Sequence, residues 1–556
     1  MKAPHPSPPP YFPLEKSTQI NYNPIRAYKT LRRIEKMKKI VGIELGSTRI
    51  KAVMIDEKAN VIATGIYSWE NRLVDGLWSY PLEQALEGLA ASYAAMAEEY
   101  RQKTGEELTA IDAIGISGMM HGYLALDKED RLLVPFRTWR NTNTEKAAAE
   151  LSEAFRFNVP QRWSVAQYYQ AVLLEESHVP QVAKLMTLAG YIHYKLTGRF
   201  VTGIGEASGM FPVSGGEYDR AMMEKFGHVL EARGIDPDFK KVMPKILKAG
   251  DSAGVLTEEG AKLLDPSGKL KAGVPFCPPE GDMQTGMVCS DAIAPGEANF
   301  SAGTSCNIVI VLEKPLNGYR KEIDVMLTPE GYETAMIHGN NCTSEIDSWV
   351  KLFGEVAALC GASVSKRELY DLLYCKSLEG DADTGGVIGY NYLAGEAIAG
   401  AETGALLIAR RPSGKLSLAN FMQMMVYSAV SSIALGMDIL AEAGVKLTAV
   451  TAAGGFYKTD FVGQNATSAM FRVPVTVMQT AGEGGAWGMA LLASYMLQKD
   501  NFSNLSAFLR VAFSGVEKKT IMASDNDVAK FDRFFKLYKR GLPAELLMAA
   551  SMNDGE

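Results

Sequence analysis

The chain has 556 residues, 47% of them hydrophobic, and a formal net charge of −7. This length predicts two or more domains with sizeable cores. The acidic balance argues against nucleic acid or an anionic membrane surface as the main partner. No run of about 18 uninterrupted apolar residues is present, so no transmembrane helix is predicted.

Six cysteines lie between residues 277 and 375, without a C-x-x-C pair and without the spacing of a zinc site. They are Cys277, Cys289, Cys306, Cys342, Cys360 and Cys375. We expect reduced thiols in a cytoplasmic enzyme rather than a disulfide framework. The N-terminus lacks the apolar core of a secretion signal.

The first 36 residues have an unusual composition. They begin with the proline-rich run PHPSPPPYFP and become rich in Lys and Arg from Arg26 onward. Proline cannot join regular hydrogen-bonded structure, so we expect residues 1–36 to be a flexible extension. Met37 is a candidate true start of the protein; a transit peptide suits the prolines and acidic residues less well.

The folded chain is predicted to begin with a β-meander. Two β-rich runs, 40–45 and 50–55, flank a small-residue turn, and a third run follows at 61–67. The turn consists of Gly46, Ser47 and Thr48. Such a turn lets backbone N–H groups and hydroxyls approach an anion closely, which makes it a candidate phosphate-binding hairpin.

Two charged residues adjoin this turn. Glu44 could hold Mg²⁺ through water, and Lys51 could face a phosphate group. An ordinary surface hairpin with solvated charges is the alternative interpretation.

A helix over 81–104 and a buried strand over 111–117 come next. The strand leads into Gly118-Met-Met-His-Gly122, and loops at the carboxyl ends of strands are where open α/β sheets bind ligands. Met120 and His121 are therefore candidate ligand-binding residues, although a histidine satisfied within a turn is the alternative. Trp139 precedes a helix starting near Thr144 and could stack on a sugar or fill a core. Residues 145–213 are predicted to be helical with breaks.

The segment from Cys277 to Asn307 repeats the pattern of the first hairpin. It contains one carboxylate, Asp282, and then a turn between the apolar runs 298–300 and 308–312. That turn contains Gly303, Thr304 and Ser305. Residues 332–338 could supply a third strand, so the second half of the chain is predicted to repeat the first.

The remaining elements are mostly helical. Helices are predicted over 345–357 and over the Met-rich stretch 421–443, which is typical of a core helix. A strand over 446–452 ends in Gly454, Gly455 and Phe456 and is followed by a helix through Met470. This junction could admit a nucleotide, or its glycines could serve only tight packing. The segment 478–487 is predicted to open a final helix near Ala486.

Four motifs in this order resemble the FGGY-type carbohydrate kinases over about residues 38–540. They are I-E-L-G-S-T-x-x-K-A at 43–52, S-G-M-M-H-G at 117–122, H-Y-K-L-T-G…T…E-A-S-G at 193–209, and G-D-M-Q-T-G…A-G-T-S at 281–305. The resemblance implies an α/β fold of two ribonuclease-H-like (actin-like ATPase) domains around a central cleft. It implies a sugar-binding domain over 37–285 with the first phosphate hairpin, an ATP-binding domain over 286–540, and a tail over 541–556.

The resemblance also implies the roles of the candidate residues. Asp282 would be the general base, and Met120, His121 and Trp139 would contact a small-molecule sugar. ATP would lie between the two hairpins, with its adenosine against residues 454–456. Mg²⁺ would be held through waters by Glu44 and Asp282. Family members are often homodimers, although no segment here reveals an interface.

The sugar is less well specified. M-H-G and Y-L-A-G-E (392–396) resemble xylulokinases, which implies a ketopentose such as D-xylulose, whereas residues 531–538 resemble ribulokinases. The chain departs from the family by having Glu44 instead of Asp, M-Q-T after Asp282, and Asn141 and Asn143 in its W-x-D-x-R segment. Two alternatives from other classes are an actin- or chaperone-like ATPase and a catalytically weak sugar sensor.

Overall fold

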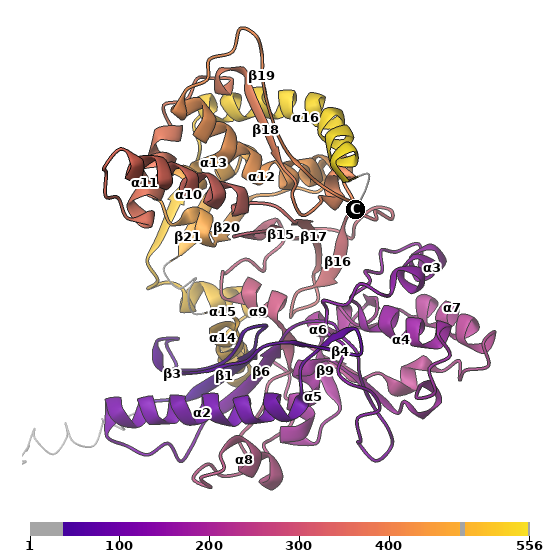
Figure 1. Ribbon diagram of the computed structural model, residues 1–556. Helices are drawn as coiled ribbons and strands as arrows, with labels where there is room; N and C mark the ends of the chain where they lie inside the picture. The colour runs from indigo at the N-terminus through magenta and orange to yellow at the C-terminus, as the bar shows by residue number, and fades with distance from the viewer. Residues whose placement is uncertain (1–36, 479–483, 554–556) are drawn as a thin grey trace, which may run out of the picture. The chain divides into compact units, whose positions relative to one another are not determined.

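The computed structural model describes residues 37–478 and 484–553. The predicted extension 1–36 lies outside the described residues, as do residues 479–483 of the segment predicted to open a helix. Residues Lys38–Glu556 form one compact unit, which is built on two main β-sheets and the helices that cover them (Figure 1).

The first sheet has five strands in the order β13-β6-β1-β2-β3. Strands β1 (Ile40–Leu45), β2 (Arg49–Ile55) and β3 (Val61–Ser68) form the predicted antiparallel meander. Strands β6 (Ala113–Gly118) and β13 (Glu280–Gly281) run parallel to β1. The carboxyl ends of β1, β6 and β13 therefore meet at one edge of the sheet.

The second sheet has seven strands in the order β16-β17-β15-β14-β20-β21-β22. These are β14 (Glu297–Ala302), β15 (Cys306–Val311), β16 (Asp324–Leu327), β17 (Glu333–Gly339), β20 (Ala449–Ala453), β21 (Val475–Met478) and β22 (Lys518–Ile521). Strands β14, β15 and β17 form an antiparallel meander, while β20 and β21 run parallel to β14. Five central strands thus reproduce the order of the first sheet, and the predicted repeat is confirmed.

Side-chain alternation along β1 sends successive residues to opposite faces of the first sheet. Val41 and Ile43 share a core with helix α2 (Leu82–Thr104), which lies against β2 and β3 (Figure 1). Ile40 shares another core with helix α14 (Gly484–Gln498). At Gly42 a Cβ atom would lie 2.0 Å from the backbone oxygen of Ala486, so glycine is required for α14 to approach the sheet.

The chain between β3 and β13 adds elements beyond the sheet. The strands are β4 (Arg72–Val74), β5 (Leu77–Ser79), β7 (Leu124–Leu126), β8 (Lys184–Met186), β9 (Val201–Gly203), β10 (Val213–Ser214), β11 (Glu217–Tyr218) and β12 (Lys245–Leu247). The helices are α3 (Glu145–Phe155), α4 (Ser164–Leu173), α5 (Leu188–Thr197), α6 (Ile204–Ser208), α7 (Arg220–Glu231) and α8 (Glu258–Leu264). The prediction of broken helices over 145–213 is confirmed.

Around the second sheet lie a small β-hairpin and further helices. They are α10 (Ser344–Leu359), α11 (Lys366–Ser377), β18 (Val387–Asn391), β19 (Leu406–Arg410), α12 (Leu418–Glu442) and α13 (Val462–Phe471). Among the described helices, α12 alone is long and apolar enough by composition to cross a membrane, but 72% of its apolar window is buried inside the protein. Methionines such as Met422 and Met424 belong to this core, as predicted.

The prediction that α14 is the final helix is wrong. Helices α15 (Leu505–Ala512) and α16 (Asp525–Asn553) follow it, and α16 continues without a break past residue 540. The distal part of α16 packs into the protein, because the buried Glu545 accepts a hydrogen bond from the Ala405 N–H at 3.2 Å. Sequence reasoning missed this because the helix carries many charges on its exposed side.

Glu545 should make the stability of the protein depend on pH. Burial raises its pKa to about 7. The folded state therefore holds a proton that the unfolded state releases above about pH 4.5, and stability falls as the pH rises toward 7. In the wild type this effect should lower the free energy of unfolding by about 2–3 kcal/mol as the pH rises, and Glu545→Gln should remove that dependence. Urea unfolding of both proteins between pH 5 and 8 measures it; parallel curves would contradict the assignment.

Candidate active site

The edge of the first sheet brings together three predicted segments. Leu45 on β1 is in register with Gly118 on β6, and Gly118 with Gly281 on β13. The hairpin tip, the loop 119–122 and Asp282 therefore follow directly from adjacent strand ends. The Met119 N–H donates to the Leu45 carbonyl at 3.1 Å, which ties the first two segments to each other.

Asp282 is the first residue of helix α9 (Asp282–Val288). Its Oδ1 accepts hydrogen bonds from the backbone N–H groups of Met120 (3.3 Å) and Met283 (3.0 Å). The side chain keeps a solvent-accessible face, yet the surrounding protein atoms desolvate it and raise the pKa of its carboxyl above the ordinary value. A carboxylate whose pKa lies closer to working pH is a better proton acceptor than one in open water.

Glu44 lies close to Asp282. Desolvation, followed by the negative charge of Asp282, raises the pKa of Glu44 to about 7. Lys51, directly opposite on β2, lowers that pKa by its positive charge. The carboxylate also abuts Gly485, where a Cβ would lie 2.4 Å from Oε1.

Two further carboxyl groups lie behind Asp282. Glu280 and Glu206 are buried, and burial raises the pKa of Glu280 to about 8 and the pKa of Glu206 well above its ordinary value. Sequence reasoning did not select them, although Glu206 belongs to the E-A-S-G motif.

The donor set suits Mg²⁺ held mainly through water. No cluster of three or more His, Cys, Asp and Glu side chains able to hold a metal occurs among residues 37–478 and 484–553. Mg²⁺ keeps several of its waters and is commonly bound by one or two carboxylates together with phosphate oxygens. Glu44 and Asp282 fit that pattern.

The tip of the first hairpin lines a pocket of about 890 Å³ together with Trp139 and Arg140. Ser47 and Thr48 are exposed there, while the Gly46 and Ser47 carbonyls are held by Trp69 Nε1 (2.7 Å) and the Tyr80 hydroxyl (2.6 Å). Trp139 is 42% exposed, so the interpretation of this residue as a core side chain is wrong. The predicted phosphate hairpin and Trp139 thus share a pocket, which Met120, His121 and Asp282 do not line.

Asn141 occupies the position of the aspartate in the W-x-D-x-R segment. Its hydrogen bonds in this fold require an amide side chain. Its Oδ1 accepts from the Trp78 N–H at 2.8 Å, and its Nδ2 donates to the Trp78 carbonyl at 2.9 Å. An aspartate could not donate the second bond. The side chain is buried and committed to the turn at β5, so it does not supply charge to a ligand.

His121 is buried, and both of its ring nitrogens have partners. Nδ1 lies 3.0 Å from the Gly209 carbonyl, and Nε2 accepts from Arg162 Nε at 3.2 Å. Burial and the Arg162 charge lower its pKa to about 3, so the ring is neutral. Arg162 also forms an ion pair with Asp324. No motif pointed to either residue, since Arg162 and Asp324 are far from His121 in sequence.

The second hairpin is fixed at its tip by the loop 340–344. The Cys342 N–H donates to the Thr304 carbonyl (2.9 Å), and the Thr343 N–H and hydroxyl both donate to the Gly303 carbonyl (3.0 and 2.7 Å). Glu396, from the Y-L-A-G-E motif, is buried beneath this loop. Its carboxylate accepts from the N–H groups of residues 340 and 341, the Asn341 side chain and the Ser432 hydroxyl, at 3.0–3.3 Å.

We expect Glu396→Gln to loosen this hairpin. The glutamine NH₂ would face backbone and hydroxyl donors, which leaves buried groups unpaired and costs about 2–4 kcal/mol. The KM for ATP should rise while the KM for sugar changes little. Thermal melting and steady-state kinetics measure both, with the exposed Glu402→Gln as the matched control. An unchanged ATP KM in Glu396→Gln would show that the loop does not position the hairpin.

The glycines after β20 adjoin the second hairpin. At Gly454 a Cβ would lie 2.2 Å from the Ala302 carbonyl oxygen, so the two strand ends are in close contact. Gly454 and Gly455 are exposed, as a nucleotide-binding backbone requires. The Phe456 side chain is fully buried in the core, so only its backbone is available to a nucleotide.

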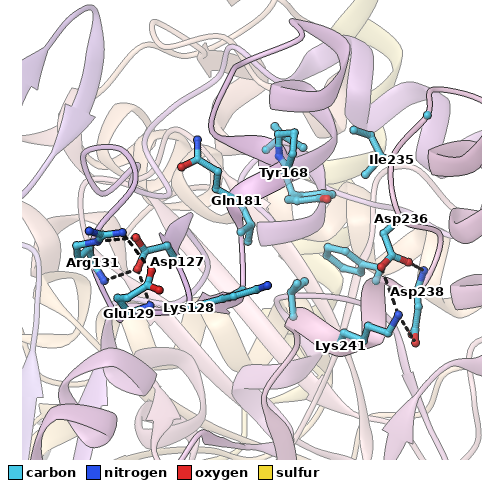
Figure 2. Close-up of a pocket in the computed structure, with 17 residues that line it drawn as sticks. Asp127, Lys128, Glu129, Arg131, Tyr168, Gln181, Ile235, Asp236, Asp238 and Lys241 are labelled. Atoms are coloured by element: carbon cyan, nitrogen blue, oxygen red, sulfur yellow. Dashed lines mark hydrogen bonds and ion pairs between the residues drawn. The ribbon is translucent and has the colours of Figure 1, made fainter.

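A second pocket, of about 790 Å³, is lined by a different set of residues (Figure 2). Its charged side chains are largely paired with one another: Arg131 with Asp127 and Glu129, and Lys241 with Asp236 and Asp238. None of the residues predicted from the sequence lines this pocket. We assign it no function.

Comparison with known proteins identifies the family. Residues 39–289 match the N-terminal domain of the FGGY family of carbohydrate kinases, and residues 298–497 match its C-terminal domain. This chain belongs to the FGGY family of carbohydrate kinases. The predicted family is therefore confirmed, and so is an enzyme that transfers a phosphoryl group to a sugar.

Individual FGGY kinases resemble the chain at low identity. The xylulose kinase of Haemophilus influenzae is 25% identical over 486 residues, covering 82% of this chain and 90% of that protein. Among solved structures, a ligand-bound xylulose kinase from Lactobacillus acidophilus covers 93% of this chain and all of its own, with a TM-score of 0.75 and 18% identity. A gluconate kinase from the same organism has the same coverage and identity and a TM-score of 0.74. The predicted two-domain fold of this family is confirmed.

The six cysteines are all free, as predicted from their spacing. Cys277, Cys306 and Cys342 are buried. No disulfide therefore contributes to the site or to the fold among these residues.

Proposed function

We propose that this FGGY kinase transfers the γ-phosphoryl group of ATP to a hydroxyl of a ketopentose resembling D-xylulose, with Asp282 as the general base. The observation that carries the proposal is the position of Asp282. It follows strand β13 at the sheet edge that also presents the first hairpin and the loop 119–122, and its pKa is raised toward the working range. The ketopentose rests on the sequence similarity to xylulose kinases.

The chemistry requires a proton acceptor. A sugar hydroxyl is a weak nucleophile, and a positioned carboxylate that accepts its proton as the new P–O bond forms accelerates the transfer. Asp282 can accept this proton on Oδ2, because both backbone hydrogen bonds are accepted by Oδ1. The proton passes from the hydroxyl to Asp282, and ADP leaves as the bond between the γ-phosphorus and the β–γ bridging oxygen breaks.

The two hairpins are proposed to hold the phosphates. Ser47, Thr48 and Thr304 are exposed at the tips, and the carbonyls of both turns are already engaged, which orients the turns. Gly454 and Gly455 would lie against the nucleoside. Mg²⁺, held through water by Glu44 and Asp282, would neutralise the transferring charge.

Met120, Trp139 and the loop at His121 are proposed to hold the sugar. Since both nitrogens of His121 are engaged, this residue would act by shaping the loop rather than by a direct hydrogen bond. The wide pocket at Trp139 leaves room for a sugar to stack on the exposed indole.

A coupled ADP-release screen tests the function. Purified protein with Mg²⁺-ATP would be offered ketopentoses, ketohexoses, polyols and aldonates. Turnover with D-xylulose supports the proposal. Turnover only with L-ribulose, another ketose or a polyol would replace the sugar and keep the class. Sugar-independent hydrolysis would indicate an actin- or chaperone-like ATPase, and binding without turnover would indicate a sugar sensor.

A further inference from the structure

The loop Met119–Gly122 is held in a strained conformation. His121 has a φ of 66° and Gly122 a φ of 86°, so two consecutive residues lie in the left-handed region. For a non-glycine residue this conformation is unfavourable by roughly 1–3 kcal/mol and persists only when surrounding contacts enforce it. Two of the contacts that hold the loop in this conformation come from Arg162.

Arg162 contacts this loop through both its backbone and its side chain. Its carbonyl accepts the Gly122 N–H at 3.3 Å, and its Nε donates to His121 Nε2 at 3.2 Å. A guanidinium can only donate, so Nε2 is the acceptor and the imidazole proton is on Nδ1. Nδ1–H then donates to the Gly209 carbonyl at 3.0 Å. The ring is thus fixed on both sides.

Arg162 is itself held by residues outside the loop 119–122. Its guanidinium forms an ion pair with Asp324, the first residue of β16. Asp324 Oδ1 also accepts from Asn158 Nδ2 at 2.8 Å, and the Arg162 carbonyl accepts from Gln167 Nε2 at 3.2 Å. Strand β16 is the edge strand of the second sheet, so Arg162 connects the sugar-side loop to that sheet.

The same loop also contacts Asp282, the proposed base. The Met120 N–H donates to Asp282 Oδ1, and Met120 immediately precedes the strained residue His121. A shift of the loop therefore moves the donor that orients the carboxylate. An error of about 1 Å in such a position can lower a rate by about 10²-fold.

From these contacts we infer that Arg162 is a positioning residue for sugar phosphorylation, acting by holding the His121 ring in one orientation and the loop 119–122 in one conformation. Asp324 completes the arrangement. The inference rests on the proposed function for its kinetic part only.

The first test is spectroscopic and needs no substrate. Two-bond ¹H–¹⁵N correlation spectra of histidine-labelled protein, with His121→Asn for assignment, should show His121 as the Nδ1–H tautomer, still neutral at pH 5. In Arg162→Met the Gly209 carbonyl still requires the proton on Nδ1, so the tautomer should be kept, whereas the Nε2 chemical shift should change because Nε2 loses its hydrogen-bond donor. Arg131→Met, which removes a surface ion-paired arginine, should leave the spectrum unchanged. An unaltered His121 Nε2 chemical shift in Arg162→Met would overturn the inference.

The second test separates positioning from general stability. Arg162→Met should raise the KM for the sugar and lower kcat, each by about tenfold or more, while the KM for ATP stays within about twofold. Arg162→Lys, which keeps the charge but not the planar fork, should be intermediate. Equal effects on both KM values, or none, would overturn the inference.

A third variant covers misfolding. If Arg162→Met does not fold, Asp324→Asn takes its place, because it removes the ion pair and leaves the arginine present. It should change the His121 Nε2 chemical shift in the same direction, because the guanidinium is no longer fixed by its ion pair, and an unchanged shift would overturn the inference. If wild-type protein shows no sugar-dependent turnover, the proposed function fails, and the Nε2 measurement still decides whether Arg162 holds the His121 ring.

Discussion

Asp282→Asn is expected to lower sugar-dependent ADP release by about 10³-fold, because a positioned general base contributes about 10²–10⁴ to such a rate. The asparagine Oδ1 can still accept the two backbone hydrogen bonds from Met120 and Met283. The fold should therefore be preserved, and the melting temperature should stay the same or rise, since a desolvated charge is removed. The measurements are coupled ADP release and thermal melting.

The matched control for this variant is Asp291→Asn. Asp291 lies just beyond α9, and burial raises its pKa to about 6. It has a φ of 50°, which asparagine also tolerates. This variant should retain wild-type turnover. Asp282→Asn with more than about a tenth of wild-type turnover would rule out Asp282 as the base, given the size of general-base effects.

The pH dependence of the wild-type enzyme follows from the same residue. Because the pKa of Asp282 is raised in the folded protein, its reactive carboxylate form is lost on acidification at a higher pH than for an ordinary aspartate. kcat/KM for the sugar should therefore fall on the acid side, and the residual activity of Asp282→Asn should lack that limb. If kcat/KM of Asp282→Asn falls on the acid side as it does in the wild type, the titrating group is a residue other than Asp282.

Gly454→Ala should be the most damaging single substitution on the nucleotide side. Gly454 has φ 115° and ψ 178°, a region open essentially only to glycine, and its Cβ would meet the Ala302 carbonyl at 2.2 Å. Backbone strain and overpacking together should cost about 3–5 kcal/mol. Since Ala302 directly precedes the Gly303 turn, the KM for ATP should rise by about tenfold or more. Urea unfolding and ATP titration measure the two effects.

Gly455→Ala is the control that tests nucleotide contact at this backbone without a steric clash inside the fold. A Cβ at Gly455 has no neighbour within 4 Å, so this variant should melt with the wild type. Its KM for ATP then reports whether a nucleotide approaches that backbone. If Gly454→Ala melts like Gly455→Ala, the close contact between β20 and β14 is not maintained in solution.

Local pattern determined much of this protein. Adjacent residues alone predicted the two meanders, the small-residue turns at Gly46 and Gly303, and the strand leading into Met120 and His121. They also predicted the family. Strand periodicity and turn chemistry depend on a few neighbouring residues, so they can be recognised without knowledge of the fold. The end of the chain was misread because α16 carries many charges on its exposed side and because Ala405, the partner of its buried Glu545, is remote in sequence.

Only the tertiary structure decided which side chains surround the predicted ones. Parallel pairing of β1, β6 and β13 brings Glu44, Met120 and Asp282 to one edge, although Asp282 is far from the other two in sequence. Arg162 reaches both His121 and Asp324, and Glu396 reaches the loop behind Gly303. These contacts depend on strand order and on the packing of distant segments. Hydrogen bonds and ion pairs between remote residues leave no period in the sequence, so no local pattern could reveal them.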